Sequence, residues 1–165
     1  MSYQTKLLNS SYIKNEFDCG KELLNSYLHK QASQDIKRYL SACFVIADDE
    51  NKIIGYYTLS NSSIDRELIP EELKSKLPKS YNDLPVTLLG RLARDKNSKE
   101  KRVGETLLLD ALKRSYDTSL NIGSIAVIVD PIDDEAKEFY LKYGFISLPD
   151  SEKMFLTMKT ISSLF

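Results

Sequence analysis

The second half of the sequence alternates between short apolar runs and longer stretches whose apolar residues recur three and four positions apart. Val86–Ala93 and Ile125–Val129 are the apolar runs, and they predict buried strands. The stretches 103–120 and 133–143 each predict a helix that buries one side. Strands that alternate with helices in this way indicate a sheet that is covered by helices.

The first half predicts a helix followed by a hairpin. Residues 42–47 and 53–59 are rich in β-branched and aromatic side chains and are separated by a polar stretch, which predicts two antiparallel strands. The apolar spacing over 21–40 predicts one long helix or two short ones. The stretch 61–84 predicts an irregular excursion that holds a short helix around 71–77.

Two further short strands, 145–148 and 154–158, complete the predicted sheet. The predicted fold class is therefore α/β (α+β), centred on one mixed sheet. No repeat, low-complexity tract or linker divides the 165 residues, so we expect a single domain over 1–165.

The composition is that of a folded globular chain, with 42% hydrophobic and 28% charged residues. The longest strongly apolar run, Ile125–Val129, is far shorter than the roughly 20 residues that cross a bilayer. The first twenty residues show no secretory signal. We therefore expect a cytoplasmic protein with no membrane partner.

Cysteine and histidine are scarce. Cys19, Cys43 and His29 cannot complete a four-ligand zinc site without carboxylates. We expect two buried thiols and no metal.

The net charge of −1 gives no general attraction to nucleic acid, but the charges are unevenly distributed. Between positions 91 and 102, six basic residues stand against two acids, whereas 130–138 holds five acids and one lysine. Such runs are commonly solvated faces. The basic run, however, leads directly into the predicted helix 103–120.

A helix start offers backbone N–H groups and a positive dipole end, which together favour an anion such as a pyrophosphate. A solvated loop that enters an amphipathic helix is the open alternative. The sequence contains neither G-x-G-x-x-G nor G-x-x-x-x-G-K-[ST], which argues against the dinucleotide-binding and P-loop classes.

The stretches GRLARD at 90–95, KEKRVGETLLLDALKR at 99–114 and VDPIDDEAKEFYLKYGF at 129–145 follow one another in an order that resembles the GNAT superfamily of acetyl-CoA-dependent N-acetyltransferases. FDCGKELLNSYLHKQASQD at 17–35, GYYTLS at 55–60 and the closing MKTISSLF are similar to the toxins of that superfamily that acetylate aminoacyl-tRNA. The resemblance implies a mostly antiparallel central sheet with a splayed cofactor slot, covered by helices.

The superfamily's pyrophosphate loop, R/Q-x-x-G-x-G/A, falls here on Lys99, Arg102 and Gly104, so that Arg102 replaces a glycine. If this position requires a left-handed backbone, a side chain there costs roughly 1–2 kcal/mol, which pairing of the guanidinium with a phosphate could recover. The resemblance implies that strand residues 92 and 93 hold the pantetheine amides. The full set of implied cofactor contacts is Leu92, Ala93, Arg94, Lys99, Glu100, Lys101, Arg102, Val103, Gly104 and Glu105.

The resemblance assigns the general acid to Tyr140. When an amine attacks a thioester, the departing thiolate is best protonated, and a phenol with a pKa of about 10 suits that task. Without the motif, a tyrosine at this helical spacing would be expected to pack in the core.

No general base stands out. An α-amino group with a pKa of about 8 is roughly a tenth neutral at neutral pH, whereas lysine is almost entirely protonated, which favours aminoacyl-tRNA as the acceptor. A protein or small-molecule amine is the alternative acceptor, and a catalytically silent interaction module is the alternative function. We expect Arg91, Ser60 and Asn61 to contact the acceptor.

Recognition of tRNA would need an extended basic surface. The candidates for it are Lys74, Lys76, Lys79, Arg91, Arg94, Lys96, Lys113 and Arg114. The resemblance further implies a homodimer and a small ribbon–helix–helix antitoxin that blocks the site.

Overall fold

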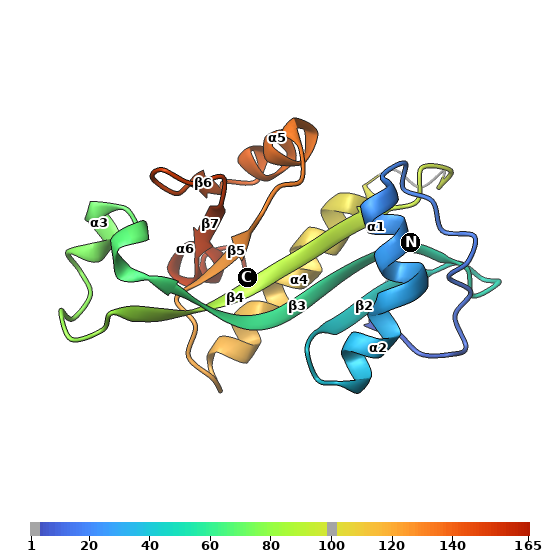
Figure 1. Cartoon of the computed structure of the whole chain (residues 1–165), viewed down its shortest axis with the longest axis horizontal. Helices are drawn as coiled ribbons and strands as arrows, with labels where there is room; N and C mark the ends of the chain where they lie inside the picture. Colours follow the sequence, from blue (N-terminus) through green and yellow to red (C-terminus); the bar gives the residue numbers. More distant parts are fainter. Residues whose placement is uncertain (1–3, 99–101) are drawn as a thin grey trace. The chain divides into compact units, whose positions relative to one another are not determined.

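A computed structural model describes residues 4–98 and 102–165 (Figure 1). Its strands form one sheet in the order β1-β2-β3-β4-β5-β7-β6. The pairs β1–β2, β2–β3, β5–β7 and β6–β7 are antiparallel, and β4–β5 is parallel. The predicted mixed, mostly antiparallel sheet is therefore confirmed. The strands are β1 (Lys6–Leu7), β2 (Ala42–Ala47), β3 (Ile53–Asp65), β4 (Asp83–Arg94), β5 (Ala126–Val129), β6 (Ile146–Ser147) and β7 (Met154–Thr157).

The predicted helices are present at nearly the expected positions. Residues 22–37 form one helical segment that is interrupted by a π-helical turn. No helix in the described part of the chain is long and apolar enough to cross a membrane. The helices are α1 (Glu22–Ser26), the π-helical η1 (Tyr27–Gln31), α2 (Ala32–Lys37), the 3-10 helix η2 (Arg66–Leu68), α3 (Glu71–Lys74), α4 (Val103–Ser119), α5 (Asp134–Lys142) and α6 (Met158–Ser162).

The chain forms two compact units, Met1–Ser60 with Leu89–Ala111 and Asn61–Leu88 with Leu112–Phe165. We call them the first and the second unit. Strands β3 and β4 and helix α4 each contribute residues to both units. A compact unit is not by itself an independent domain, so the single domain over 1–165 stays a prediction.

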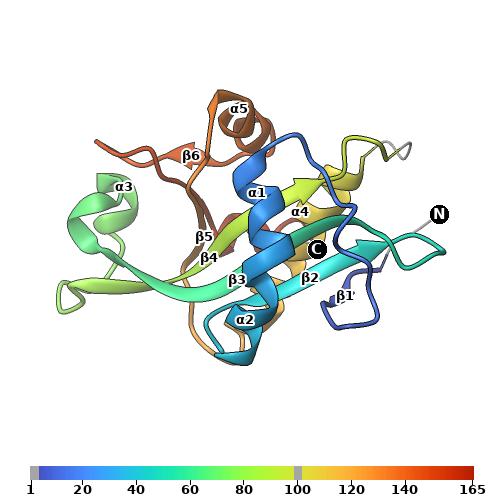
Figure 2. The ribbon, with the colours of Figure 1, turned by 45° about the vertical axis from the view of Figure 1, so that its right-hand side comes forward.

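In the first unit, β3 separates two helical layers because its side chains alternate between the faces of the sheet. Tyr56 packs with Leu24, Tyr27 and Leu28 of the α1–α2 segment, which lies across the strands in Figure 2. Gly55 faces the other way, toward α4. A Cβ atom built on Gly55 would lie only 2.8 Å from the Leu107 side chain, so glycine allows α4 to approach β3 closely.

The second unit has its own core. Buried residues from the outer part of β3, from β4, β5 and β7, and from the loops beside them pack together, and they are Ile64, Ile69, Leu84, Val86, Ala126, Ile128, Leu148 and Phe155. Alternation of apolar residues along β4 and the continuous apolar run of β5 explain why these strands were predictable.

The excursion predicted over 61–84 is shorter and more regular than expected. Strand β3 continues to Asp65 and β4 begins at Asp83, so only 66–82 lies outside the sheet. The Arg66 guanidinium holds this loop, since it donates to the carbonyl oxygens of Lys74, Leu77 and Pro78 at 2.9, 3.0 and 2.6 Å and to that of Tyr81 at 3.4 Å. The polar Asn61–Asp65 segment was not predicted as strand because it lacks apolar alternation.

Other short elements were also missed. Strand β1 has two residues, which is too short to produce a periodic pattern. Residue Met158, predicted to end a strand, instead begins α6, because the Thr157 hydroxyl accepts a hydrogen bond from the Thr160 amide and caps a helix there. Cys43 is buried as predicted, but Cys19 is only partly buried, and both thiols are free.

We predict that Gly55→Ala destabilises the protein by about 1–3 kcal/mol, because the added methyl group overpacks the contact between β3 and α4. Urea unfolding measures the change. Gly123→Ala is the matched control, since a Cβ atom at Gly123 meets no atom within 4 Å. Equal stability of the two variants would contradict the close packing at Gly55.

Candidate functional site

The loop that enters α4 adopts a conformation that is unusual for its sequence. Arg102 has φ of +75°, in the left-handed region that favours glycine. Its carbonyl oxygen accepts the first α4 hydrogen bond, from the Thr106 amide at 2.9 Å, and the next residue, Val103, is fully buried. The Arg102 side chain is exposed at this helix start. The backbone at Arg102 is therefore left-handed, and an arginine in this conformation costs roughly 1–2 kcal/mol.

Two other predicted cofactor contacts follow this position on α4. Gly104 and Glu105 are partly buried in the first turn of α4. The first amides of an α-helix have no partner within the helix, so this turn can donate to an anion. Lys99, Glu100 and Lys101 lie outside the described residues. Their predicted role stays a prediction.

Hydrogen bonds at the two ends of β4 identify the residues beside β3 that it faces. The Arg66 amide donates to the Asn82 carbonyl, and the Asp95 amide donates to the Ile54 carbonyl. Residue 82, just before β4, therefore lies beside residue 66, and residue 95, just after β4, lies beside residue 54. Parallel pairing of β4 with β5 is short, joining Thr87 to Val127 and Leu88 to Ile128.

Beyond the residues of β4 that pair with β5, the hydrogen bond from Asp95 to Ile54 shows which backbone groups face β3. Since backbone groups alternate between the two edges of a strand, those of Ala93 are directed toward β3 and those of Leu92 and Arg94 toward the opposite edge. The Ala93 side chain is buried in the core of the first unit, whereas Arg94 is exposed. Leu92 and Arg94 are thus the residues whose amides a ligand at that edge would meet.

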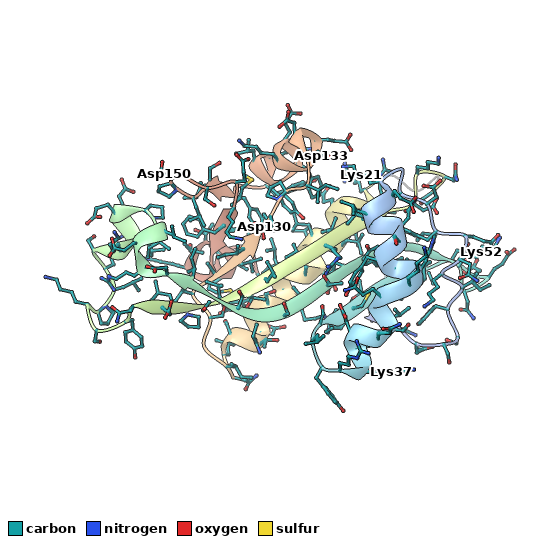
Figure 3. The ribbon with its side chains drawn as sticks, in the orientation of Figure 1. Lys21, Lys37, Lys52, Asp130, Asp133 and Asp150 are labelled. Atoms are coloured by element: carbon teal, nitrogen blue, oxygen red, sulfur yellow. The ribbon has the colours of Figure 1, made fainter. Side chains whose placement is uncertain are left out.

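Tyr140 is held rigidly in the second unit. Helix α5 begins where the Asp133 carboxylate accepts from the Ala136 amide at 2.8 Å (Figure 3), and it ends before Gly144, whose φ is +93°. The Phe145 amide donates back to the Tyr140 carbonyl at 3.1 Å. The sequence prediction of this helix and both its ends is confirmed.

Tyr140 is 7% exposed, and its ring packs against Phe139 and Phe145, with centroids 5.4 and 5.2 Å away. Burial raises the pKa of its phenol, which keeps the proton on the oxygen. No group among the described residues forms a hydrogen bond with the hydroxyl. A protonated and unengaged phenol of this kind can donate a proton to a ligand.

A hydrogen-bonded network joins the start of α1 to the residues after β4. The Asp18 carboxylate accepts from the Gly20 amide at 2.8 Å and the Asn25 side chain at 2.9 Å, and it pairs with Lys96 at 3.1 Å. These bonds, first of all the one from Gly20, lower the pKa of Asp18 to about 2. The Asp95 carboxylate in turn accepts from the Asp18 amide at 3.0 Å.

This network fixes the chain at Asp95 and Lys96, which lie within the basic run at positions 91–102. The stretch 17–35 carries a family resemblance in the sequence, but no role for Asp18 or Asn25 is predicted from it. The available signal was the aspartate two positions before Gly20, because aspartate commonly binds a backbone amide two residues further on.

The predicted acceptor residues lie on β3 and β4. Ser60 is partly buried and Asn61 exposed. The Arg91 guanidinium lies 3.5 Å from the centroid of the Tyr27 ring. The predicted basic surface is weaker than its composition suggests, because several candidates are paired within their own unit: Lys74 with Glu67 at 3.1 Å, Lys96 with Asp18 at 3.1 Å and Lys113 with Asp117 at 2.8 Å.

Comparisons with known proteins identify similar chains. No family model matches the sequence. A tRNA-acetylating toxin of Mycobacterium tuberculosis is 33% identical over 149 residues, which cover 90% of this chain and 87% of the toxin. A crystal structure of KacT, a tyrosine-to-phenylalanine mutant, is 30% identical, with a TM-score of 0.92 and complete coverage of both chains.

AtaT complexed with acetyl-methionyl-tRNAfMet is 28% identical, with a TM-score of 0.89 and 99% coverage of both chains. A tyrosine-to-phenylalanine mutant of AtaT bound to acetyl-CoA and to the C-terminus of the antitoxin AtaR is 25% identical, with a TM-score of 0.83 and coverage of 100% of this chain and 99% of that one.

We predict that Asp18→Asn lowers the free energy of unfolding above pH 4 and that its difference from the wild type shrinks as the pH falls from about 4 toward 2. The sign follows from the lowered pKa: the folded state stabilises the carboxylate, and this contribution is lost when Asp18 is protonated. Urea unfolding at several pH values measures it. Glu22→Gln, which also removes one negative charge, is the control for net charge. A deficit that persists unchanged at pH 2 would contradict the prediction.

We predict that Arg102→Gly increases the free energy of unfolding by about 1 kcal/mol, because glycine relieves the left-handed backbone. Arg38→Gly is the matched control, since Arg38 has φ of −94° and glycine there should destabilise by about 0.5–1 kcal/mol. Thermal or urea unfolding distinguishes the two. Destabilisation of both variants to the same extent would argue against strain at Arg102.

Proposed function

The chain belongs to the family of GNAT-fold tRNA-acetylating toxins, and on that basis we propose that it transfers the acetyl group of acetyl-CoA to the α-amino group of an aminoacyl-tRNA. The observation that carries this proposal is the similarity to the mycobacterial tRNA-acetylating toxin, which extends over 90% of the chain. The AtaT complexes, one with acetyl-methionyl-tRNAfMet and one with acetyl-CoA, support the same pair of substrates.

Acetyl-CoA supplies a thioester, and the features of the first unit suit its binding. The edge of β4 at Leu92 and Arg94 offers backbone groups for the pantetheine amides. The start of α4 offers unpaired amides for the pyrophosphate, and the exposed Arg102 guanidinium adds a planar donor beside them. The contacts at Val103, Gly104 and Glu105 belong to the same proposal, whereas Arg94 takes the place of the predicted contact at Ala93, because the backbone groups of Ala93 are directed toward β3 and its side chain is buried.

Tyr140 is proposed as the general acid. The neutral amine of the acceptor attacks the thioester carbonyl carbon, the nitrogen releases a proton to water, and the carbon–sulfur bond breaks. The phenol then donates its proton to the departing thiolate. Because burial raises the pKa of Tyr140, the group stays protonated at the pH where an α-amine begins to be neutral.

Ser60, Asn61 and Arg91 are proposed to contact the acceptor. We also propose that the protein acts in the cytoplasm, where charged tRNA is found, as a homodimer that an antitoxin inhibits. The complex of AtaT with the C-terminus of AtaR supports an antitoxin partner. A protein or small-molecule amine is the alternative acceptor, since the same transfer would serve any neutral amine.

Expression of the wild type in cells, followed by mass spectrometry of intact charged tRNA, tests the acceptor. We expect N-acetylated aminoacyl ends. Purified protein that acetylates peptides or small amines but leaves aminoacyl-tRNA unmodified would move the acceptor to the alternative class. Calorimetry that detects no acetyl-CoA binding at high micromolar concentration would instead support a silent interaction module.

We predict that Tyr140→Phe lowers kcat by about a hundredfold or more while leaving acetyl-CoA affinity unchanged, because the variant keeps the packed ring and loses only the acid. Tyr143→Phe removes a hydroxyl from the same end of α5 and serves as the control. Stopped assays with aminoacyl-tRNA measure the rates. Similar rates for the two variants would assign the acid elsewhere.

A further inference from the structure

Arg91 has an unusual environment in the first unit. It lies on β4 and is partly buried, and its guanidinium lies 3.5 Å from the centroid of the Tyr27 ring, which is stacking distance. Within 4–98 and 102–165, it forms no hydrogen bond and no ion pair. One face of the guanidinium is thus held against the Tyr27 ring, and the N–H donors along its edge have no partner among the described residues.

The surface beneath Arg91 is rigid. The Tyr27 hydroxyl donates to the Asp35 carboxylate at 2.8 Å, and its ring stacks with that of Tyr56 at a centroid distance of 6.3 Å. The Tyr56 hydroxyl donates to the Leu24 carbonyl at 2.7 Å. Tyr27 is also the first residue of the π-helical turn η1, an uncommon geometry that is frequent at functional sites.

Such an arrangement suits a flat, strongly charged ligand group. Stacking fixes the guanidinium plane, so little side-chain freedom remains to be lost on binding. Its edge matches two oxygens of a phosphate in a bidentate pair. A carboxylate is the usual partner of an arginine held in this way, and none occupies that place among the described residues.

We infer that Arg91, held flat on Tyr27, binds a backbone phosphate in the single-stranded 3′ end of the acceptor nucleic acid. The inference rests on the proposed function and specifies which residue of this chain orients the aminoacyl end. Arg91 is the phosphate ligand, and Tyr27 is a positioning residue that acts through it.

The coenzyme is the other source of phosphate, and the geometry of the first unit favours the nucleic acid. Arg91 projects to the face of the sheet that Tyr27 and the α1–α2 segment cover. Gly55 of β3 contacts Val103 and Leu107 of α4 on the opposite face. The start of α4, where the pyrophosphate is proposed to bind, is therefore on the other side of the strands from Arg91.

Two model acceptors distinguish recognition of the phosphate from recognition of the rest of the substrate. One is a CCA trinucleotide that is aminoacylated at its 3′ end and carries phosphodiesters, and the other is the same aminoacyl ester of adenosine, which carries no phosphate. We expect Arg91→Gln to raise KM for the trinucleotide about ten- to hundredfold, with kcat and KM for the adenosine ester and for acetyl-CoA changed less than about twofold. Arg91→Lys, which keeps the charge but loses the planar fork, should give an intermediate KM.

Lys52→Gln is the matched control, because it removes one positive charge from the β2–β3 turn of the same unit (Figure 3), where Lys52 already pairs with Glu16 and Glu50. It should leave every KM unchanged. Tyr27→Leu should shift KM for the trinucleotide in the same direction as Arg91→Gln. Thermal unfolding verifies that each variant is folded.

Equal loss on both acceptors would overturn the inference, because Arg91 would then act on the aminoacyl group or on the fold. A rise confined to KM for acetyl-CoA would also overturn it and assign the phosphate to the coenzyme. Fluorescence anisotropy of a labelled, unacylated CCA trinucleotide measures the same site without turnover. Loss of that binding in Arg91→Gln supports the phosphate site even if no aminoacyl-tRNA is acetylated, whereas wild-type binding by Arg91→Gln overturns it even if acetylation proceeds.

Discussion

The two-residue alternation of β3 at Gly55 and Tyr56 determines how the first unit is built. Gly55 admits α4 on one face because it has no side chain, and Tyr56 anchors the α1–α2 segment on the other through its ring and its bond to Leu24. A helix start and an aromatic surface are thereby placed on opposite sides of the same strand.

Much of this architecture was predictable from apolar periodicity, and the exceptions have a common physical cause. Helices α4 and α5 and strand β5 were predicted nearly to the residue, because their apolar spacing is regular and Gly144 ends α5. The outer half of β3 was missed because Asn61, Ser62 and Ser63 are polar, and main-chain pairing decides their conformation. The π-helical turn at Tyr27 could not be predicted, because one wider turn only offsets the apolar spacing of the helix, and an offset spacing still indicates a helix.

The candidate site also contains residues that the sequence indicates and residues that only the fold brings together. Tyr140 and the basic run at positions 91–102 could be predicted as site residues from the sequence, because each lies in a contiguous motif. The network of Asp18, Asn25, Lys96 and Asp95 joins residues that are up to 78 positions apart, and no local pattern indicates that they meet. Arg91 was expected to contact the acceptor, but its stacking on Tyr27 depends on the approach of two distant segments. Long-range polar contacts of this kind require the fold.

The loop at 66–82 is held by one guanidinium that binds four carbonyl oxygens and, among the residues that the structure describes, no side chain. Main-chain oxygens are the same whatever residue carries them, so most of the outward-facing side chains of this loop can be exchanged without loosening its anchor. The course of the loop backbone thus depends on the single side chain of Arg66, and the chemistry of its outward surface is set independently by its other residues.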